Sequence, residues 1–292
     1  MSEDPFVAHR SLLFTVAYEV LGSAADAEDV VQETWLRWAA VDDAKRCEVR
    51  DSRAYLVRIV TRLCLNRLRS LARQREEYVG EWLPEPVLTG PDVAEDVELA
   101  ESVSIAMLAV LETLLPTERA VFVLREVFDV PYDEIAEALD KSPAAVRQIA
   151  TRARKHVAAR RPRRSVSRTE QQRVVERFLA ALTTGDVPGL LEVLAPDVLV
   201  VGDGGGLAPT IVKPVRGSAK LAPVMARFAE AAPGARAFIV DLNGAIAARI
   251  DPGGENETAV SFVIEDGRIT EIYAIRNPHK LERLGEVTEL RR

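Results

Sequence analysis

Residues 142–155 carry side chains whose chemistry suits the edges and phosphates of nucleic acid. Arginine and glutamine offer donors and acceptors to base edges, lysine and arginine neutralise phosphates, and a small residue such as Ala145 permits close approach. Ser142 is a good N-cap, and Pro143 follows it at a position where a missing N–H does no harm. Together with the amphipathic segment 133–140, this order predicts a helix-turn-helix whose second helix reads DNA. The predicted DNA-contacting residues are Ser142, Ala145, Arg147, Gln148, Thr151, Arg152, Arg154 and Lys155.

A second basic helix is predicted over residues 52–75. This stretch contains seven arginines and no acidic residue, whereas residues 76–118 contain eleven acids and no lysine or arginine. Residues 141–168 then carry ten lysines or arginines and again no acid. The net charge of −7 therefore conceals two basic blocks separated by an acidic one. This pattern indicates two surfaces for a polyanion, joined by a segment that avoids it.

Other classes of function find little support in the composition. Two cysteines and three histidines are scattered without metal-like spacing, so we expect neither a zinc site nor a disulfide framework. We expect no cofactor, no metal and no catalytic residue. No apolar run approaches the roughly 20 residues that span a bilayer, and the N-terminus is acidic and polar. The chain is predicted to be cytoplasmic, with no membrane partner.

The elements that position these side chains are also readable from the sequence. Helices are expected over residues 24–39, capped by Ser23, and over 52–75. Residues 76–101 are expected to form an extended linker, because the stretch EWLPEPVLTGPD within them holds three prolines and a glycine. Helices should resume near residue 99. Beyond residue 170, two helices, a strand, a helix and four further strands predict an α+β domain with an antiparallel sheet.

Two segments resemble the bacterial RNA polymerase sigma factors. LPTERAVFVLREVFDVPYDEIAEALDKSPAAVRQIATRARKHV resembles region 4, which reads the −35 promoter element. AEDVVQETWLRW, followed by DSRAYLVRIVTRLCLNRLRS, resembles region 2, which binds the polymerase and the −10 element. The short chain without further sigma regions is similar to the extracytoplasmic-function (ECF) group. The resemblance implies two partners, core RNA polymerase and promoter DNA, and no chemistry of the chain's own.

The resemblance gives each predicted surface a role. The helix-turn-helix residues above become −35 contacts. Cationic side chains on the second basic helix suit a single strand being melted at the −10 element, and the candidates are Arg58, Arg62, Asn66, Arg67 and Arg69. A mixed apolar and acidic face on the helix over 24–39 suits docking onto a basic protein helix pair, and its residues are Asp26, Asp29, Gln32, Glu33, Trp35 and Leu36. Any one of these residues could instead pack in the helical core and make no contact with the polymerase.

Three further motifs resemble the ECF subgroup with a fused SnoaL-like domain: WLPEPV at 82–87, DGGG at 203–206 and NPHKL at 277–281. The basic residue expected after DGGG is Leu207 here, which leaves the role of that position open. Trp82 and Leu83 would be costly to leave exposed, so we expect them to pack against the other two motifs and fix how the DNA-reading domains sit. The predicted regulatory residues are Trp82, Leu83, Pro84, Asp203, Gly204, Gly205, Gly206, Asn277, Pro278, Lys280 and Leu281.

The predicted architecture is multidomain: two all-α sigma domains followed by an α+β NTF2-like or SnoaL-like cone. The boundaries are region 2 at 1–75, the acidic linker at 76–101, region 4 at 102–164 and the SnoaL-like domain at 165–292. Some proteins with this cone are enzymes that use Asp or His in the pocket, and Asp203, Asp241 and His279 are the weak candidates here. The alternative function is a DNA-binding regulator whose C-terminal domain senses a ligand or is catalytically active. The sequence also leaves open whether this domain binds a small-molecule or protein ligand.

Overall fold

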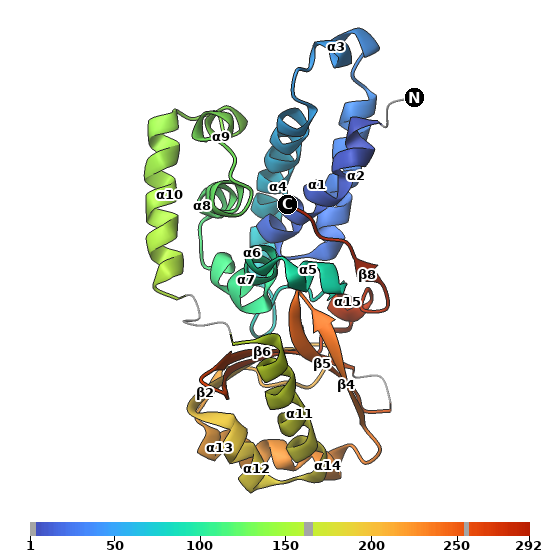
Figure 1. Ribbon diagram of the computed structural model, residues 1–292, viewed down its shortest axis with the longest axis vertical. Coiled ribbons are helices and arrows are strands. Elements are labelled where there is room, and N and C mark those ends of the chain that lie inside the picture. The colour runs from blue at the N-terminus through green and yellow to red at the C-terminus, as the bar shows by residue number, and fades with distance from the viewer. Residues whose placement is uncertain (1–3, 161–165, 254–256) are drawn as a thin grey trace.

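The computed structural model describes residues 4–160, 166–253 and 257–292 (Figure 1). The predicted boundary between residues 164 and 165 lies outside this range. The N-terminal part is a bundle of α1 (Pro5–Leu21), α2 (Ala24–Ala39), α3 (Asp43–Glu48) and α4 (Ser52–Glu76). Ser23 caps α2 through its hydroxyl, as the sequence predicts, and the Asp51 carboxylate caps α4 by accepting from the N–H of Ala54.

The segment after α4 is less extended than the sequence predicts. Residues 78–87 have no helix or strand, but a short strand β1 (Leu88–Thr89) and two helices, α5 (Pro91–Glu95) and α6 (Val97–Val103), follow before residue 104. Gly90 ends the strand, Pro91 starts α5, and the Asp96 side chain caps α6. Local capping thus overcomes the helix-breaking effect of the prolines upstream.

The next elements are α7 (Ile105–Glu112), α8 (Pro116–Phe122) with a π-helical turn η1 (Val123–Val127), α9 (Tyr132–Ala138) and α10 (Pro143–Ala158). α9 and α10 form the predicted helix-turn-helix. Asp140, in the turn between them, has a positive φ of 51°. The 16-residue helix α10 lies at the outer side of the molecule, away from α1 and α2 (Figure 1).

Within the described residues, the C-terminal domain contains five helices and seven strands of an eight-stranded sheet, whose remaining strand is β1. The helices are α11 (Arg168–Thr184), α12 (Val187–Val193), α13 (Ser218–Ala226), α14 (Phe228–Ala231) and α15 (Pro278–Leu281). The strands are β2 (Leu194–Asp203), β3 (Val215–Arg216), β4 (Arg236–Leu242), β5 (Ala245–Asp251), β6 (Thr258–Glu265), β7 (Arg268–Ile275) and β8 (Val287–Thr288). α11 covers one face of the sheet (Figure 1).

The prediction of an antiparallel sheet is wrong in two places. The strand order is β3-β2-β7-β6-β5-β4-β1-β8; β2 pairs parallel with β7, and β1 pairs parallel with β8. Hairpins join the four consecutive strands β4 to β7, which are therefore antiparallel, but β2 returns beside the last of them. The linker strand β1 also extends this sheet, through the Leu88–Leu242 register with β4.

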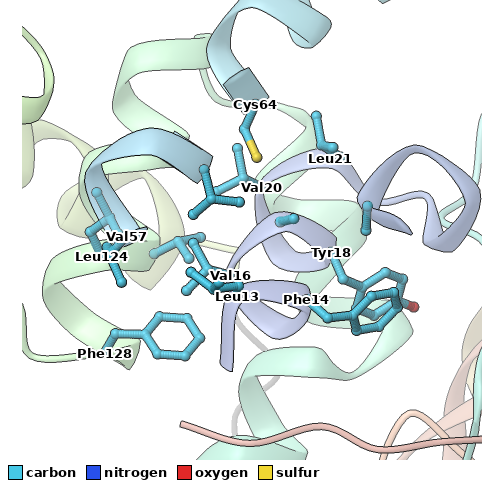
Figure 2. Close-up of a cluster of buried hydrophobic side chains, with 14 of the residues drawn as sticks. Leu13, Phe14, Val16, Tyr18, Val20, Leu21, Val57, Cys64, Leu124 and Phe128 are labelled. Atoms are coloured by element: carbon cyan, nitrogen blue, oxygen red, sulfur yellow. The ribbon is translucent and has the colours of Figure 1, made fainter. Parts of the chain in front are cut away.

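One hydrophobic core is shared by the N-terminal bundle and the helix-turn-helix region. Figure 2 shows Leu13 and Val16 of α1, Val57 of α4, and Leu124 and Phe128 at η1 in a single buried cluster. Leu290, near the other end of the sequence, belongs to the same cluster. A separate cluster fills the space between α11–α13 and the sheet. In the part of the chain that the structure describes, no helix is both long and apolar enough to cross a membrane.

Candidate nucleic-acid interfaces and the interdomain junction

The solvent face of α10 carries most of the predicted base-reading side chains. Val146, Ile149, Ala150, Ala153 and Val157 are buried and hold the helix against α8 and α9. Their helical spacing turns the exposed side chains outward together, and these are Arg147, Gln148, Thr151, Arg152, Arg154 and Lys155.

Several of these side chains already have neighbours within the domain. Arg147 lies over the Tyr132 ring, with its guanidinium carbon 5.9 Å from the ring centroid. The Ser142 hydroxyl accepts from the N–H of Ala145 and is therefore a helix cap in this structure. The Thr151 hydroxyl donates to the Arg147 carbonyl. Arg152 and Arg154 lie 3.8 Å from Glu118 and Glu126, whereas Arg147 and Gln148 are exposed in the N-terminal half of the helix.

Part of the basic face of α4 contacts the helix-turn-helix region, although the Arg62 side chain stays 45% exposed. Arg58 pairs with Glu137 of α9 at 3.1 Å. Arg62 donates to the carbonyl oxygens of Ala138 and Glu137 at 2.9 and 3.0 Å, and to the Asp140 carboxylate at 2.8 Å. Two of the five predicted −10 contacts are thus engaged by the helix-turn-helix region.

The other three candidates on α4 differ in their surroundings. Arg67 forms an ion pair with Asp26 of α2, which is 8% exposed, so this pair holds α2 against α4. Asn66 and Arg69 are exposed and hydrogen-bonded to each other at 3.0 Å. The structure therefore leaves Asn66 and Arg69 accessible, and gives Arg67 a structural partner.

An exposed mixed surface lies on α2. Trp35 and Leu36 are 37% and 60% exposed, unusual values for large apolar side chains, and Trp35 contacts the Phe6 ring at 5.0 Å between centroids. Asp29, Gln32 and Glu33 are exposed on the same helix. Asp26 does not belong to this surface, because it is buried against Arg67. The predicted docking face includes Asp26 because it is acidic and lies on the same helix as Trp35 and Leu36, and the local sequence does not indicate the ion pair from α4.

The three motifs at 82–87, 203–206 and 277–281 meet in what we call the junction cluster: Tyr78, Trp82, Asp203, Asn277 and Lys280. The Asp203 side chain is fully buried, and the Lys280 side chain is 6% exposed. The Lys280 ammonium donates to Asp203 at 2.7 Å and to the Leu83 carbonyl at 2.5 Å. Its nitrogen lies 3.3 Å from the centroid of the Trp82 ring. Strand β2, helix α15 and the segment after α4 thus converge on one buried ion pair.

Further donors complete the environment of Asp203. Its carboxylate accepts from the Tyr78 hydroxyl, from the N–H of Leu83 at 2.9 Å and from the N–H of Gly205 at 3.1 Å. Burial lowers the pKa of Lys280 to about 8, and the Asp203 charge opposes this shift. Burial also raises the pKa of Tyr78, which keeps its hydroxyl a donor to Asp203.

The DGGG turn needs glycine because its backbone lies very close to neighbouring side chains. Gly205 has a φ of +59°, and a Cβ built on it would lie 2.4 Å from the amide nitrogen of Asn277. Asn277 in turn donates to Tyr78 at 2.7 Å and caps α15 through the N–H of His279. A larger residue at 205 would therefore separate β2 from α15. Leu207, at the position of the expected basic residue, is 59% exposed.

The remaining predicted motif residues surround this cluster. Leu83 and Leu281 pack with Val201 and Tyr273 in a small buried cluster of their own. Pro84 is buried, Pro278 is exposed at the first position of α15, and Gly204 and Gly206 flank Gly205 in the turn. Arg75 of α4 also contacts the Trp82 ring, with its guanidinium carbon 4.8 Å from the centroid. Through Trp82 the junction cluster reaches the end of the basic helix.

Sequence reasoning missed two buried residues at the same interface. Asn243, at the tip of the β4–β5 hairpin, is fully buried and donates to the Tyr18 hydroxyl at 2.6 Å and to the Val103 carbonyl at 2.7 Å. Its side-chain oxygen accepts from the N–H of Val87 at 3.1 Å. The Asn-Gly pair signals a hairpin, but nothing local signals its burial. Glu85 accepts from the N–H groups of Ala24 and Ala25 and so helps to cap α2.

The three weak catalytic candidates are not assembled into one site. Asp203 is enclosed in the junction cluster, Asp241 pairs with Arg168, and His279 is exposed beside Glu282. A cavity of about 350 Å³ lies between the linker helices and the sheet, lined by residues that include Met107, Arg168 and Phe262. Neither Asp203 nor His279 lines it. Among the described residues, no group of three or more His, Cys, Asp or Glu is arranged to hold a metal ion.

Comparisons with known proteins agree with this arrangement of two helical modules and a third domain. The Sigma-70 region 2 family matches residues 6–74, Sigma-70 region 4 matches 104–157, and the SnoaL-like domain family matches 175–272. The ECF RNA polymerase sigma factor SigJ of Mycobacterium tuberculosis is 40% identical over 96% of this chain and 93% of its own length. The probable sigma factor SigI of the same species is 32% identical over 95% of this chain and 93% of its own.

A solved structure gives the same result. The crystal structure of M. tuberculosis SigJ matches with a TM-score of 0.76 at 37% identity, covering 96% of this chain and 98% of that one. A chain with these helical modules and this fused cone is a bacterial transcription initiation factor. It belongs to the ECF RNA polymerase sigma factors, in the form that carries a C-terminal SnoaL-like domain.

Proposed function

We propose that this sigma factor binds core RNA polymerase through the exposed face of α2 and reads promoters with two helices. α10 reads the −35 element, chiefly with Arg147 and Gln148, and α4 captures the melted −10 strand with its arginines. The observation that carries this proposal is the outward row of polar and basic side chains on α10, held on a helix whose opposite face is buried. Arginine and glutamine there match the hydrogen-bonding edges of guanine and adenine.

The polymerase contact is argued from exposure and chemistry. Trp35 and Leu36 are large apolar side chains that stay in contact with water, and Asp29, Gln32 and Glu33 flank them. Interfaces commonly combine aromatic anchors with a polar rim. A basic protein surface would complement the acidic side chains. Core RNA polymerase and promoter DNA are thus the two proposed partners.

We propose that the SnoaL-like domain acts through the junction cluster. Its Asp203–Lys280 pair holds the segment that follows α4, and Trp82 lies between the Lys280 ammonium and the Arg75 guanidinium. The domain would thereby set how region 2 and region 4 sit relative to one another. Regulation of this kind requires two arrangements that differ in affinity for polymerase or DNA.

Reconstitution tests both parts of the proposal. Purified chain is added to core polymerase, transcription starts are mapped, and the same promoters are then transcribed with a chain truncated after Arg168. The proposal predicts promoter-specific initiation by the full chain and altered promoter use or strength by the truncated one. Identical transcription by the two chains would remove the regulatory role from the C-terminal domain, while leaving the sigma activity intact.

The alternative is a DNA-binding regulator whose C-terminal domain senses a ligand or is catalytically active. It requires DNA binding without polymerase, and turnover or tight binding of a small apolar molecule. Such a regulator does not need the exposed apolar and acidic face of α2. The burial of Asp203 among four donors also disfavours it as a general base, because a base must reach a substrate proton.

A further inference from the structure

Arg147 differs from the other predicted DNA-contacting arginines of α10 in what lies next to its guanidinium group. Arg152 and Arg154 each lie 3.8 Å from a carboxylate, one on α8 and one on η1. Arg147 forms no ion pair in the part of the chain that the structure describes, and its guanidinium carbon lies over the Tyr132 ring, 5.9 Å from the centroid. This distance is within the range of cation–π attraction. An aromatic ring, and not a carboxylate, is therefore the neighbour of Arg147.

This difference matters for reading a base edge. A guanidinium group carries five N–H donors, and two of them bind the O6 and N7 atoms of guanine together. A carboxylate occupies such donors, so DNA has to displace it. An aromatic ring attracts the cation through its π-electrons and does not compete for the donors as a carboxylate oxygen does. The ring also restricts a long side chain whose ordering otherwise costs free energy on binding. Tyr132 can thus orient Arg147 and leave it available to a base.

The Tyr132 ring is itself held by the π-helical turn η1. Tyr132 is the first residue of α9, is half-buried and packs against the large helical core. Arg125 of η1 has its guanidinium carbon 4.9 Å from the centroid of the same ring. Arg125 pairs with Asp129 at 2.9 Å and donates to the Val130 carbonyl at 3.3 Å, so the turn between η1 and α9 fixes it in place. π-helical turns inside α-helices are frequent at functional sites. The ring therefore has a fixed position that does not depend on DNA.

We propose that Tyr132 is a positioning residue for promoter selection, which holds the Arg147 guanidinium in the direction in which it meets a base edge of the −35 element. This inference rests on the proposed −35 role of α10, and it adds to that role a residue outside α10. The contact is made by the ring and not by the hydroxyl. Phenylalanine should therefore replace Tyr132 in this role, whereas an aliphatic side chain should not.

The test is a fluorescence titration of the full chain with two duplexes at one salt concentration, one carrying the −35 element mapped with this chain and one of random sequence. Tyr132→Leu should weaken binding to the −35 duplex by about 2- to 5-fold, as expected for an exposed cation–π contact, with no comparable change for the random duplex. Tyr132→Phe should retain the affinity for both. The matched control is Phe238→Leu, which removes an exposed ring 5.8 Å from the Arg236 guanidinium carbon in the C-terminal domain and should change neither affinity.

A double variant with Arg147→Ala separates positioning from packing. In the Arg147→Ala chain, Tyr132→Leu should cause no further loss of −35 preference, because the ring acts through the guanidinium group. Urea unfolding is measured for each variant, and Tyr132→Met takes the place of Tyr132→Leu if the latter does not fold, because methionine adapts to irregular space.

Four results would overturn the positioning role of Tyr132. They are an unchanged −35 preference without the ring, an equal loss on both duplexes, an equal loss by Tyr132→Phe, and a loss that persists when Arg147 is absent. An equal loss on both duplexes would indicate that the Tyr132 side chain contacts phosphate directly. A full −35 preference in the Arg147→Ala chain would instead overturn the −35 role of Arg147 on which the inference rests.

Discussion

Replacing Lys280 with methionine removes one charge from a buried ion pair and leaves its volume nearly unchanged. Asp203 would keep three donors, from Tyr78, Leu83 and Gly205, but would lose the Lys280 ammonium, which lies 2.7 Å from its carboxylate. Breaking a buried pair from one side costs about 3–5 kcal/mol. Because the remaining hydrogen bonds stabilise the carboxylate, we expect a loss of about 3 kcal/mol, with a further ~1 kcal/mol from the lost contact with Trp82.

The assay is urea unfolding followed by tryptophan fluorescence and circular dichroism, in a double-mutant cycle with Asp203→Asn. The double variant has no unpaired buried charge, so its loss should be smaller than the sum of the two single losses by about 2 kcal/mol or more. Lys220→Met, which removes an exposed lysine of the same domain, should change the unfolding free energy by less than about 0.5 kcal/mol. A Lys280→Met loss below about 1 kcal/mol, or additive losses in the cycle, would refute the reasoning.

Four further outcomes are expected. Arg147→Ala should weaken binding to the correct −35 element by about 1–3 kcal/mol, with little change for random duplex in a fluorescence titration. Arg160→Ala should weaken all duplexes alike and reduce the salt slope of binding by about one; equal behaviour of these two variants would contradict the assignment of α10. Leu36→Ala should lower affinity for core polymerase by about 1–2 kcal/mol in a competition pull-down, with the unfolding midpoint unchanged. Burial raises the pKa of Glu19 from 4.5 to about 8, so the folded chain holds an extra proton between these values and its stability falls as pH rises. Glu19→Gln should flatten this dependence and add up to about 3 kcal/mol at pH 7, whereas parallel urea-midpoint curves for the two chains would contradict it.

Elements with strong local signals could be predicted from the sequence. The Ser142–Pro143 cap and the apolar spacing of α10 depend on neighbours within four residues, and both appear in the structure. The cap of α2 at Ser23 is of the same kind, but the contribution of Glu85 to that cap crosses 60 residues of sequence. Such long-range contacts produce no periodic pattern in the sequence from which they could be predicted.

The same distinction explains the errors. The parallel pairing of β2 with β7 is set by where the chain returns after four hairpin-linked strands, and no local pattern encodes that return. Aspartate is usually a surface residue, but Asp26 is buried. Its charge is compensated by Arg67, which lies 41 positions later in the sequence. The ion pairs of Arg58 and Arg62 with Glu137 and Asp140 join two segments that each resemble solvent-facing surfaces when considered separately. Whether a charged side chain can be buried depends on its ion-pair partner, and in these cases the partner is distant in the sequence.

The most direct measurement of the central claim is start-site mapping with purified core polymerase, with and without this chain, on a genomic template. The account predicts co-purification of the chain with the polymerase and initiation at a defined set of promoters that share spaced −35 and −10 sequences, with initiation lost when Arg147 and Gln148 are replaced by alanine. A chain that neither binds core polymerase nor directs it to any new start would contradict the account.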